Sequence, residues 1–523
     1  MAGKFEKPRS REDRNPAAAP MERRPTPSRT APARPAQEQR QAPNRPAPER
    51  RQAQLQNSPR SRGENNLPTR RPRRQRRRKS VLPIAAVTGV LLLALVVCLS
   101  VFGKEKATSS NQPEQMETQE ETQPLTVTAR ATIASQGDLL MHATIFGEKW
   151  DGNCYVGDGK YNFDSLFQYI SPYTSKADFM VANLETTLGG DSFPYQGNPS
   201  FNCPDALLDS LTGAGYDMLL TANNHCYDTV MTGLKRTVEQ VRKAGMTAVG
   251  TRLSSNEPRY AVVDVNGIQL GITCYTYTMV MDAGKPRLNN NSQVEQPELV
   301  NYFSTENLPA FYSELESVCQ QMKQDGAQAT IVYIHWGTEY ETTEDATQRA
   351  MAQKMCDMGV DVIIGGHPHV VQPMDLLSST TDPEHKTICI YSLGNAVSNQ
   401  RIEEMNLKTG HTEDGVMFSV TFEEYSDGTV KVAEVDVLPT WVNKFTNANW
   451  KYEYNILPLD KAQQDQWITQ FNLTQEQYNN ACKSYDRTMA ILAPGLNKCQ
   501  TYLSQDGAEQ PQTEATTEVT QAA

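Results

Sequence analysis

The chain has 523 residues and a formal net charge of −11, and that charge is distributed very unevenly. Residues 1–80 hold 23 lysines and arginines against 7 acidic residues, whereas the remainder holds 27 against 54. This acidity excludes nucleic acid as a general partner of the main body, because phosphate backbones attract a positive face. The length indicates more than one module.

Residues 1–80 are rich in Pro, Arg, Gln and Ala, so we expect a disordered, basic tail. The next stretch, Val81–Phe102, has 22 residues and no charge, which is enough to cross the cell membrane as a single helix. The basic run Arg76–Lys79 directly precedes it, so the tail is predicted to be cytoplasmic and to lie near anionic lipid headgroups. The body that follows is therefore expected to be extracytoplasmic.

Polar, low-complexity segments flank this body. Residues 103–128 are predicted to be a flexible linker and residues 505–523 a disordered tail. Nine cysteines lie outside the predicted span, and an odd number leaves at least one of them unpaired or in an intermolecular bond. Cys482 and Cys499 are close enough in sequence to be a candidate disulfide pair.

The first predicted strands of the body each run into a polar residue. Ala131–Ser135 leads to Asp138, with His142 four residues later, and Phe179–Ala182 leads to Glu185. A carboxylate just past a strand is well placed to bind a metal ion. A lone Gly-Asp pair, however, is more often a surface turn.

A third strand, Tyr216–Thr221, leads into Asn224 and His225, and a helix is predicted over Thr229–Ala244. The Asn224 oxygen can bind a divalent ion, and His225 can donate or accept a proton. Asp228, three residues further on, can hold that imidazole in one tautomer. Cys226 is a tempting nucleophile, but the ligand pattern accounts for its neighbours without it. Asp205–Ala214 precedes this strand as a further predicted helix.

The middle of the body supplies supporting elements. Ala261–Val265 and Ile268–Tyr275 flank Asn266-Gly267, a strong hairpin signal. Val280–Tyr302 is expected to be a long loop, and a helix is predicted over Pro309–Asp325.

Two apolar segments of strand type, Thr330–Ile334 and Val360–Ile364, are separated by a predicted helix, Ala346–Met358. Strand, helix and strand within about 40 residues form a βαβ unit with parallel strands. Ligands of such sheets bind outside the carboxyl ends of the strands. Residues that follow these two strands should therefore lie together.

The residues in those positions are histidines: His335, His367 and His369. A single histidine at a strand end is usually a satisfied loop residue. The chain has only 7 histidines, however, and three of them fall in these two turns. Convergent imidazoles favour a divalent transition metal.

The C-terminal part continues the pattern of strands. Thr387–Tyr391 is a predicted strand that runs into Ser392 and Asn395. Val416–Glu423 and Thr429–Val437 are predicted to form a hairpin. Residues 459–491 contain amphipathic helical segments, which we interpret as an appendage for packing or on the substrate side.

The six candidate ligands comprise two carboxylates, one amide and three imidazoles: Asp138, Glu185, Asn224, His335, His367 and His369. This set suits a two-metal site with one bridging carboxylate. Two ions about 3.5–4 Å apart can hold a hydroxide nucleophile and stabilise in-line displacement at phosphorus.

The same residues occur in six ordered segments that resemble the calcineurin-like metallophosphoesterase superfamily and, more closely, the CapA family of capsule synthesis, which is linked to poly-γ-glutamate. The segments are GDLLMH (Gly137–His142), NLE (Asn183–Glu185), ANNHCYD (Ala222–Asp228), HWGTEY (His335–Tyr340), GGHPHVVQ (Gly365–Gln372) and YSLGN (Tyr391–Asn395). The resemblance implies an α/β sandwich with mixed sheets over residues 129–400 and extends weakly to the following hairpin. We expect residues 401–504, with this hairpin and the helical segments, to extend the domain. The resemblance also agrees with one N-terminal transmembrane helix.

The resemblance further implies roles for individual residues. One ion would be held by Asp138, Glu185 and His369, and the other by Glu185, Asn224, His335 and His367. His225 would be the general acid, supported by Asp228. Leu140 stands where the superfamily has a histidine, so His142 is a candidate replacement. The alternatives to two ions are one ion, or none in the resting protein. The residues expected to shape substrate binding are Glu339, Tyr340, Gln372, Ser392 and Asn395, although Gln372 and Asn395 could equally satisfy loop backbone groups.

Two functions are therefore in view. The first is a metal-dependent hydrolase of phosphoester-type bonds in capsule or poly-γ-glutamate production, with two divalent ions of Mn, Fe or Zn as cofactors. The second is a non-catalytic accessory subunit that binds an anionic polymer in a membrane synthase or export complex. The acidic body disfavours binding a polyanion without bound cations, and the His225–Asp228 pair favours chemistry.

Overall fold

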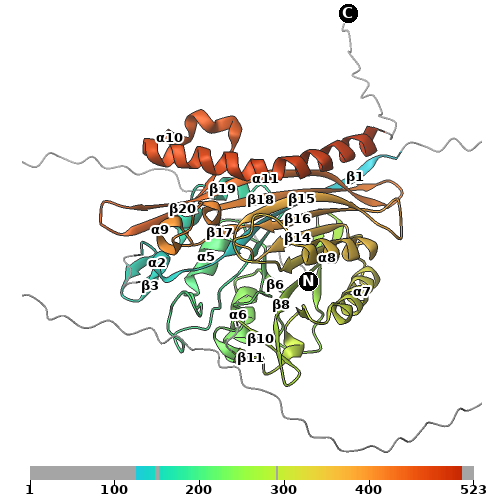
Figure 1. Ribbon diagram of the computed structural model, residues 1–523, viewed down its shortest axis with the longest axis horizontal. Helices are drawn as coiled ribbons and strands as arrows, with labels where there is room; N and C mark the ends of the chain where they lie inside the picture. The colour runs from blue at the N-terminus through green and yellow to red at the C-terminus, as the bar shows by residue number, and fades with distance from the viewer. Residues whose placement is uncertain (1–124, 148–151, 290–291, 509–523) are drawn as a thin grey trace, which may run out of the picture. The chain divides into compact units, whose positions relative to one another are not determined.

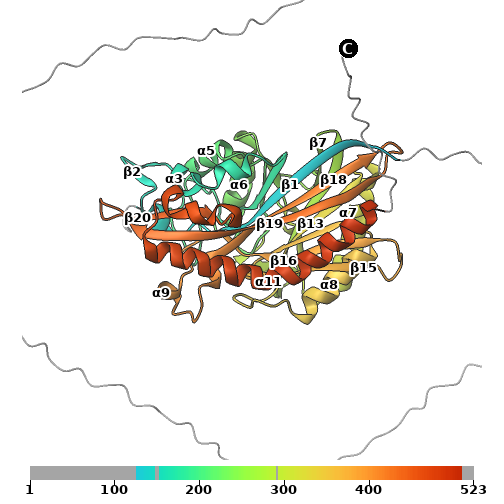
Figure 2. The same cartoon turned by 90° about the horizontal axis from the view of Figure 1, so that it is seen from above.

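Two mixed β-sheets pack face to face, and helices cover their outer faces (Figure 1). The computed structural model describes residues 125–147, 152–289 and 292–508. Figure 2 shows the same layers from above, with α11 running along the strands.

The first sheet has the order β20-β19-β18-β1-β4-β5-β6, and β17 also pairs with β1. β1 is parallel to β4 on one side and antiparallel to β18 on the other. Its strands are β1 (Val127–Leu139), β4 (Phe179–Asn183), β5 (Met218–Leu220), β6 (Thr247–Val249), β17 (Asn395–Val397), β18 (Asp414–Tyr425), β19 (Val430–Thr446) and β20 (Tyr452–Pro458).

The second sheet has the order β12-β8-β13-β14-β16-β15, and β7 also pairs with β8. The five neighbouring strands β12, β8, β13, β14 and β16 are parallel to one another. The strands β15 and β7 are antiparallel to their neighbours β16 and β8. Its strands are β7 (Tyr260–Val265), β8 (Ile268–Thr278), β12 (Tyr302–Ser304), β13 (Ala329–His335), β14 (Val362–Gly366), β15 (Val371–Ser378) and β16 (Lys386–Leu393).

The main core lies between the two sheets. It combines inward side chains of the first sheet, such as Ile133 and Phe418, with those of the second, such as Ile331 and Ile390, all at most 1% exposed. Fully burying such a side chain contributes about 1.5–3 kcal/mol. Burial on both faces also explains why β13 and β14 read as continuous apolar runs.

Helices seal the outer faces. α5 (Ala206–Gly213) and α6 (Val230–Lys243) pack on the first sheet, and α7 (Leu308–Gln324) and α8 (Ala346–Asp357) pack on the second. Asp345 caps α8 in a capping box with Gln348. The shorter elements are α2 (Ala143–Phe146), β2 (Tyr155–Gly157), β3 (Lys160–Tyr161), α3 (Asp164–Phe167), α4 (Ser171–Thr174), η3 (Pro297–Leu299), α9 (Ile402–Met405), η4 (His411–Glu413), η5 (Lys461–Gln466) and α10 (Trp467–Gln470).

The C-terminal helix α11 (Gln475–Ala508) is part of the main core. It packs along β19 and β15, and its Leu492 and Cys499 are fully buried there. A Cβ on Gly495 would lie 1.9 Å from the carbonyl oxygen of Met374, so only glycine allows this close approach. The helix therefore contacts both sheets, at β19 of the first and at the edge strand β15 of the second.

The predicted α/β class and the mixed sheets are confirmed. The expected tail over 1–80, the membrane helix over 81–102 and nearly all of the linker lie outside the described residues. Among the residues that are described, no helix combines the length and apolar character needed to cross a bilayer.

Three local predictions are wrong. The segment expected to be a loop, Val280–Tyr302, contains a small sheet of β9 (Val280–Asp282), β10 (Lys285–Leu288) and β11 (Ser292–Gln293), because a tight turn through Ala283 and Gly284 closes a hairpin in a polar stretch without readable alternation. The helix α11 runs past residue 505, the predicted start of the tail.

The third error concerns the cysteines. Cys482 and Cys499 are both free and lie 17 positions apart on α11, about 25 Å along a helix axis. A disulfide needs Cα atoms within about 7 Å, so sequence proximity was misleading here.

Candidate metal centre and active site

Strand ends from both sheets bring the predicted ligands together. Asp138 ends β1 and Glu185 follows β4 in the first sheet, whereas His335 ends β13 and His367 follows β14 in the second. Parallel strands place their carboxyl ends at one edge, and the two edges face each other across the core. All four side chains are buried, with at most 3% of their surface exposed.

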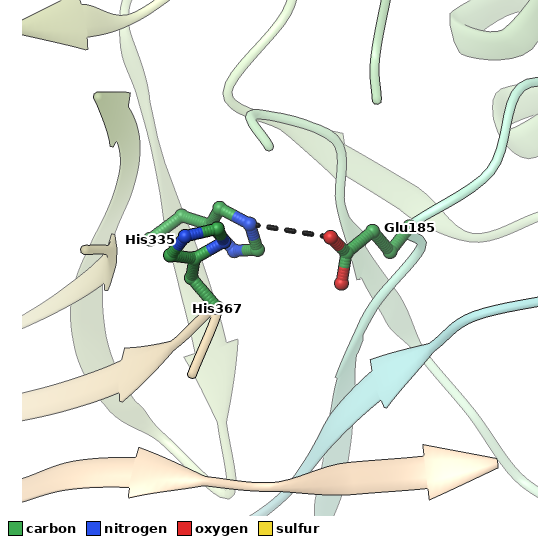
Figure 3. A group of neighbouring side chains, drawn as sticks. All are labelled: Glu185, His335 and His367. Carbon is green, nitrogen blue, oxygen red and sulfur yellow. Dashed lines mark ion pairs between the residues drawn. The ribbon is translucent and has the colours of Figure 1, made fainter. Parts of the chain in front are cut away.

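Glu185 is at the centre of this cluster. Its carboxylate is fully buried, and neither oxygen has a hydrogen-bond partner among the described residues. Figure 3 shows Oε1 of Glu185 facing Nε2 of His335, at 3.3 Å. The Nε2 atom of His369 lies 3.9 Å from the same oxygen. An unpaired buried carboxylate costs several kcal/mol unless a cation compensates it.

Two groups of ligand atoms share Glu185. One consists of Glu185, His335 and His367, and the other of Asp138, Glu185 and His369; within each group the ligand atoms lie within 4.8 Å of one another. Glu339 forms a third such group with His367 and His369. The first two groups coincide with the two ligand sets that the family resemblance implied. Glu185 is thus the residue that these two groups have in common.

The remaining predicted ligand, Asn224, joins the first group. Its Oδ1 lies 2.7 Å from Nε2 of His335. Nδ1 of His367 is a further buried atom without a hydrogen-bond partner among the described residues. Orphaned carboxylate and imidazole atoms in one cluster are the donor set that a divalent ion takes, so the residues present fit the implied metal.

The protonation states of the cluster differ from residue to residue. Burial opposes ionisation of Asp138, but the hydrogen bond and charge of His369 outweigh it and hold the pKa of Asp138 below its ordinary value. Burial also disfavours charge on His369, yet Glu185 and Asp138 overcome this and raise its pKa to about 9. Burial and repulsion from His335 lower the pKa of His367 well below its ordinary value. His367 is therefore neutral, which is the form that binds metals.

The backbone around the paired histidines is strained. His367 and His369 have φ values of +94° and +57°, a region that L residues rarely adopt. A Cβ on Gly365 would lie 1.9 Å from the carbonyl oxygen of Tyr391, so the glycine lets β14 approach β16 closely. Strain of this kind is tolerated where the surrounding structure fixes a functional geometry.

His225 and Asp228 form a hydrogen-bonded dyad beside the cluster. Nδ1 of His225 lies 2.7 Å from Oδ2 of Asp228, which also accepts the backbone N–H of Phe201 at 2.6 Å. Asn289 donates from Nδ2 to Oδ1 of Asp228 at 3.0 Å and to the carbonyl oxygen of Pro199 at 2.7 Å. These two bonds use both protons of the amide, so its 3.2 Å approach to Nδ1 of His225 is a contact only.

A cavity of about 320 Å³ opens beside the dyad and the cluster. Its lining includes His225 and His369. Two of the predicted substrate-binding residues, Glu339 and Tyr340, also line it and can therefore contact a ligand. His142 also lines it, but belongs to none of the ligand groups. Burial lowers the pKa of His142 to about 4, and its Nδ1 lies 3.1 Å from the backbone nitrogen of Asn399.

The other three predicted substrate-binding residues are fully buried and do not line this cavity. Gln372 donates to the carbonyl oxygen of Glu341 at 2.8 Å, and Ser392 accepts the backbone N–H of Gly394 at 3.2 Å. Oδ1 of Asn395 lies 3.1 Å from Nδ1 of His369. Gln372 and Ser392 therefore stabilise loops, and Asn395 contacts the imidazole ring of the candidate ligand His369. None of the three is placed to contact substrate in this cavity.

Four supporting residues were missed by the sequence analysis. Asn183 donates to Oδ1 of Asp138 at 2.7 Å, and Asn223 donates in turn to Asn183 at 3.0 Å. The ring of Tyr277 stacks on His335 with an interplanar angle of 8°. Asn183 and Asn223 could have been found, because each adjoins a predicted ligand in its motif, but Tyr277 and Asn289 carry no such signal.

Comparison with known proteins gives a consistent picture. Residues 132–400 match the family described as bacterial capsule synthesis protein PGA_cap. The chain is 29% identical over 263 residues to capsule biosynthesis protein CapA of Bacillus anthracis, covering 49% of this chain and 59% of that protein. It is 26% identical over 283 residues to PGA biosynthesis protein CapA of Bacillus subtilis strain 168, covering 52% and 65%. The matches thus span less than two thirds of either relative.

A solved structure, the crystal structure of TT1561 of Thermus thermophilus, aligns with a TM-score of 0.28 and 8% identity, over 56% of this chain and 94% of that one, which is too distant to support an argument. The family match, in contrast, covers about half of the chain and contains every residue of the three ligand groups. The chain therefore belongs to the family of bacterial capsule synthesis proteins.

Proposed function

We propose that this protein is a metal-dependent hydrolase of phosphoester-type bonds that acts in capsule production outside the cytoplasm. The observation that carries the proposal is the buried carboxylate of Glu185. Neither of its oxygens has a hydrogen-bond partner among the described residues, and two groups of metal-compatible side chains share it. A buried carboxylate without hydrogen bonds destabilises the fold unless a cation compensates its charge, so its presence supports a cation-binding site.

Asp138, Glu185 and His369 would hold one divalent ion, and Glu185, Asn224, His335 and His367 a second. A bound pair of such ions supplies Lewis acidity and a strong nucleophile at neutral pH. Asn183 and Asn395 fix the orientation of Asp138 and His369 through the hydrogen bonds described above.

The chain's own proton donor is His225. Asp228 binds Nδ1 of its ring, and Nε2 has no hydrogen-bond partner among the described residues, so that nitrogen is free to serve a substrate in the cavity. In hydrolysis, a bond forms between phosphorus and the oxygen of water, the ester P–O bond breaks, and His225 gives a proton to the leaving oxygen. General acid catalysis of this kind contributes about 10²–10⁴-fold.

The place of action is part of the same proposal. The apolar segment Val81–Phe102 would anchor the protein in the cell membrane, with the basic tail in the cytoplasm and the body outside. The two similar proteins are named for capsule and PGA biosynthesis. A membrane synthase or export complex for such a polymer is the partner that this location favours.

The test uses the full-length protein purified in detergent. We expect stoichiometric divalent metal by elemental analysis and turnover of bis(p-nitrophenyl) phosphate. His225→Ala should keep the metal and lose at least about a hundredfold in kcat for a methyl phenyl phosphodiester, whose leaving oxygen needs protonation. His411→Ala is the matched control, because His411 lies on η4 outside the cavity lining. Metal-free protein, or metal-loaded protein that turns over neither diester, would instead favour the accessory, polymer-binding role. Full turnover of the methyl phenyl diester by His225→Ala would exclude His225 as the proton donor.

A further inference from the structure

The cavity beside His225 has an unusual lining. Carboxamide side chains dominate it, namely Asn198, Asn224, Asn289, Asn399 and Gln400. Its charged members, apart from histidines, are Glu339 and Glu404, and none of its lining residues is a lysine or an arginine. A site with amides and carboxylates, and without a lysine or arginine side chain, favours a ligand that is itself uncharged away from the metal ions.

The nearest cation does not change this balance. Nζ of Lys444 lies 2.5 Å from Oε1 of Glu404 and 3.1 Å from Oδ1 of Asn399. The ammonium group is thus paired with a carboxylate before any ligand arrives. A polymer with one carboxylate per residue would find no lysine or arginine in the lining and would meet the carboxylates of Glu339 and Glu404.

The carboxamide of Asn399 is poised for a neutral polar ligand. Its Oδ1 is fixed by the donor Lys444 and by the hydroxyl of Tyr454 at 2.7 Å, and an ammonium group can only donate, so the amide orientation is certain. Nδ2, the other end of the amide, has no partner among the described residues, although Asn399 is only 7% exposed. Asn198, on the same lining, also has a side chain without a hydrogen-bond partner in the described part of the chain.

A carboxamide carries both donors and acceptors, which is the pattern that hydroxyl groups match. In this lining, Nδ2 of Asn399 and the amide of Asn198 have no hydrogen-bond partner among the described residues, whereas Asn289 and Gln400 already have partners. The ring of Phe201, which packs edge-on against His225 at 4.6 Å, and the ring of Tyr340 add apolar surface for C–H groups. A volume of about 320 Å³ is at the lower end for small-molecule sites. A sugar ring combines hydroxyls, apolar C–H faces and this size.

We propose that the cavity binds the leaving alcohol of the substrate as an uncharged sugar, so that the protein cleaves a phosphodiester of a sugar hydroxyl. The inference rests on the proposed function and specifies its substrate class. It also gives the dyad a purpose, because a sugar alkoxide is a poor leaving group that must be protonated as its bond to phosphorus breaks. In the balanced step, water adds across the P–O bond, the proton of His225 Nε2 goes to the sugar oxygen, and a phosphomonoester remains.

The test compares three probes on the full-length, metal-loaded protein. They are bis(p-nitrophenyl) phosphate, the methyl phosphodiester of glucose at O6, and the methyl phosphodiester of serine within a γ-glutamate tripeptide. We expect kcat/KM for the glucosyl diester to exceed that for the glutamyl diester by at least tenfold. Equal values, or a preference for the glutamyl diester, would overturn the inference while leaving hydrolysis of the generic diester, and so the proposed function, in place.

Two variants locate the preference in the cavity. Asn399→Asp keeps the oxygen that Lys444 and Tyr454 bind, replaces the amide donor with a carboxylate oxygen and adds one negative charge. All probes carry the same phosphodiester charge, so a ratio between probes separates the loss of the donor from the effect of that charge. Asn198→Ala alters an exposed side chain, so both variants should fold. We expect the ratio of kcat/KM for the glucosyl diester to that for bis(p-nitrophenyl) phosphate to fall about tenfold in Asn399→Asp and to fall measurably in Asn198→Ala. Asn449→Ala, an exposed control outside the lining, should keep the wild-type ratio. An unchanged ratio in both cavity variants would contradict the proposal, whereas no turnover of any probe by metal-loaded protein would reject the proposed function itself.

Discussion

Asn289 donates a hydrogen bond to Oδ1 of Asp228 at 3.0 Å, although the two residues are 61 positions apart. Asn289 follows β10 in the small three-stranded sheet, whereas Asp228 lies just before α6. Together with the backbone N–H of Phe201 and the ring of His225, it gives the Asp228 carboxylate three donors. The small sheet therefore holds the orienting carboxylate of the proposed proton donor.

This relationship predicts a selective defect in Asn289→Ala. The variant frees one oxygen of Asp228, so His225 is held less firmly and protonates the leaving oxygen less effectively. We expect kcat to fall by about tenfold or more for a methyl phenyl phosphodiester and by much less for the p-nitrophenyl analogue, whose leaving group needs little protonation. Steady-state kinetics with both substrates measures this difference.

Asn449→Ala serves as the control, since Asn449 is exposed in the turn between β19 and β20. A purely structural role for Asn289 would lower kcat for both leaving groups by the same factor, and that result would contradict the positioning role.

Glu185→Gln should affect metal binding and stability in opposite directions. In the metal-free protein, the proton on His369 balances only one of the two buried carboxylates, Asp138 and Glu185. Removing the second negative charge should stabilise the metal-free fold by about 1–3 kcal/mol. The same change removes the ligand shared by both groups, so metal content should fall below stoichiometry.

Chemical denaturation of metal-free protein and elemental analysis of metal-loaded protein measure the two effects. Glu476→Gln, at an exposed position of α11, should change neither. If Glu185→Gln destabilised the metal-free protein, the carboxylate would have a structural partner, and the main argument for a cation site would fail.

The core of the site could be predicted from the sequence because its chemistry follows parallel strands. Apolar runs that lead into His335 and His367 predict two parallel strands and place two metal-compatible side chains at their carboxyl ends. Asp138 and Glu185 are predicted in the same way, because they lie at the ends of the parallel strands β1 and β4. The rest depends on contacts between distant segments that have no local signature. Asn289 reaches the dyad from a polar stretch without alternation, so nothing in its neighbours indicates its position.

Substrate contact was the least predictable property. Gln372 and Asn395 stand in the same motifs as the ligands, yet their side chains turn into buried loops and satisfy backbone groups there. Asn198 and Asn399, in contrast, lie outside the quoted motifs and line the cavity. A residue that belongs to one of these motifs can be predicted to lie near the site. The direction of its side chain depends on packing, which the motif does not show.

Gly495→Ala tests the docking of α11. The new Cβ would collide with the carbonyl oxygen of Met374, which is backbone and cannot easily move. We expect the free energy of unfolding to fall by about 1–3 kcal/mol or more, as measured by urea denaturation. Gly213→Ala is a matched control at the end of α5, where a Cβ meets nothing within 4 Å, and it should be neutral or stabilising by up to about 1 kcal/mol. Equal effects of the two substitutions would show that α11 does not depend on this close approach.

Metal binding should release a proton from His369. In the metal-free protein, burial lowers the pKa of this residue, but Glu185 and Asp138 raise it to about 9, above the ordinary 6.5. The imidazolium therefore stabilises the metal-free fold fully below pH 6.5, and this contribution is lost as the pH rises through 9. A metal ion must displace that proton. Below pH 9, the part of the metal affinity that depends on His369 should therefore decrease about tenfold for each unit by which the pH is lowered.

Isothermal titration calorimetry at pH 7.5 in buffers of different ionisation enthalpy counts the protons released. We expect His369→Asn to release about one proton fewer than the wild type, because asparagine has no proton to give up on binding. His411→Asn should release as many protons as the wild type, since His411 belongs to none of the ligand groups. If His369→Asn and the wild type released equal numbers, His369 would already be neutral in the metal-free protein. The charge balance proposed for the buried cluster would then have to rest on a different residue.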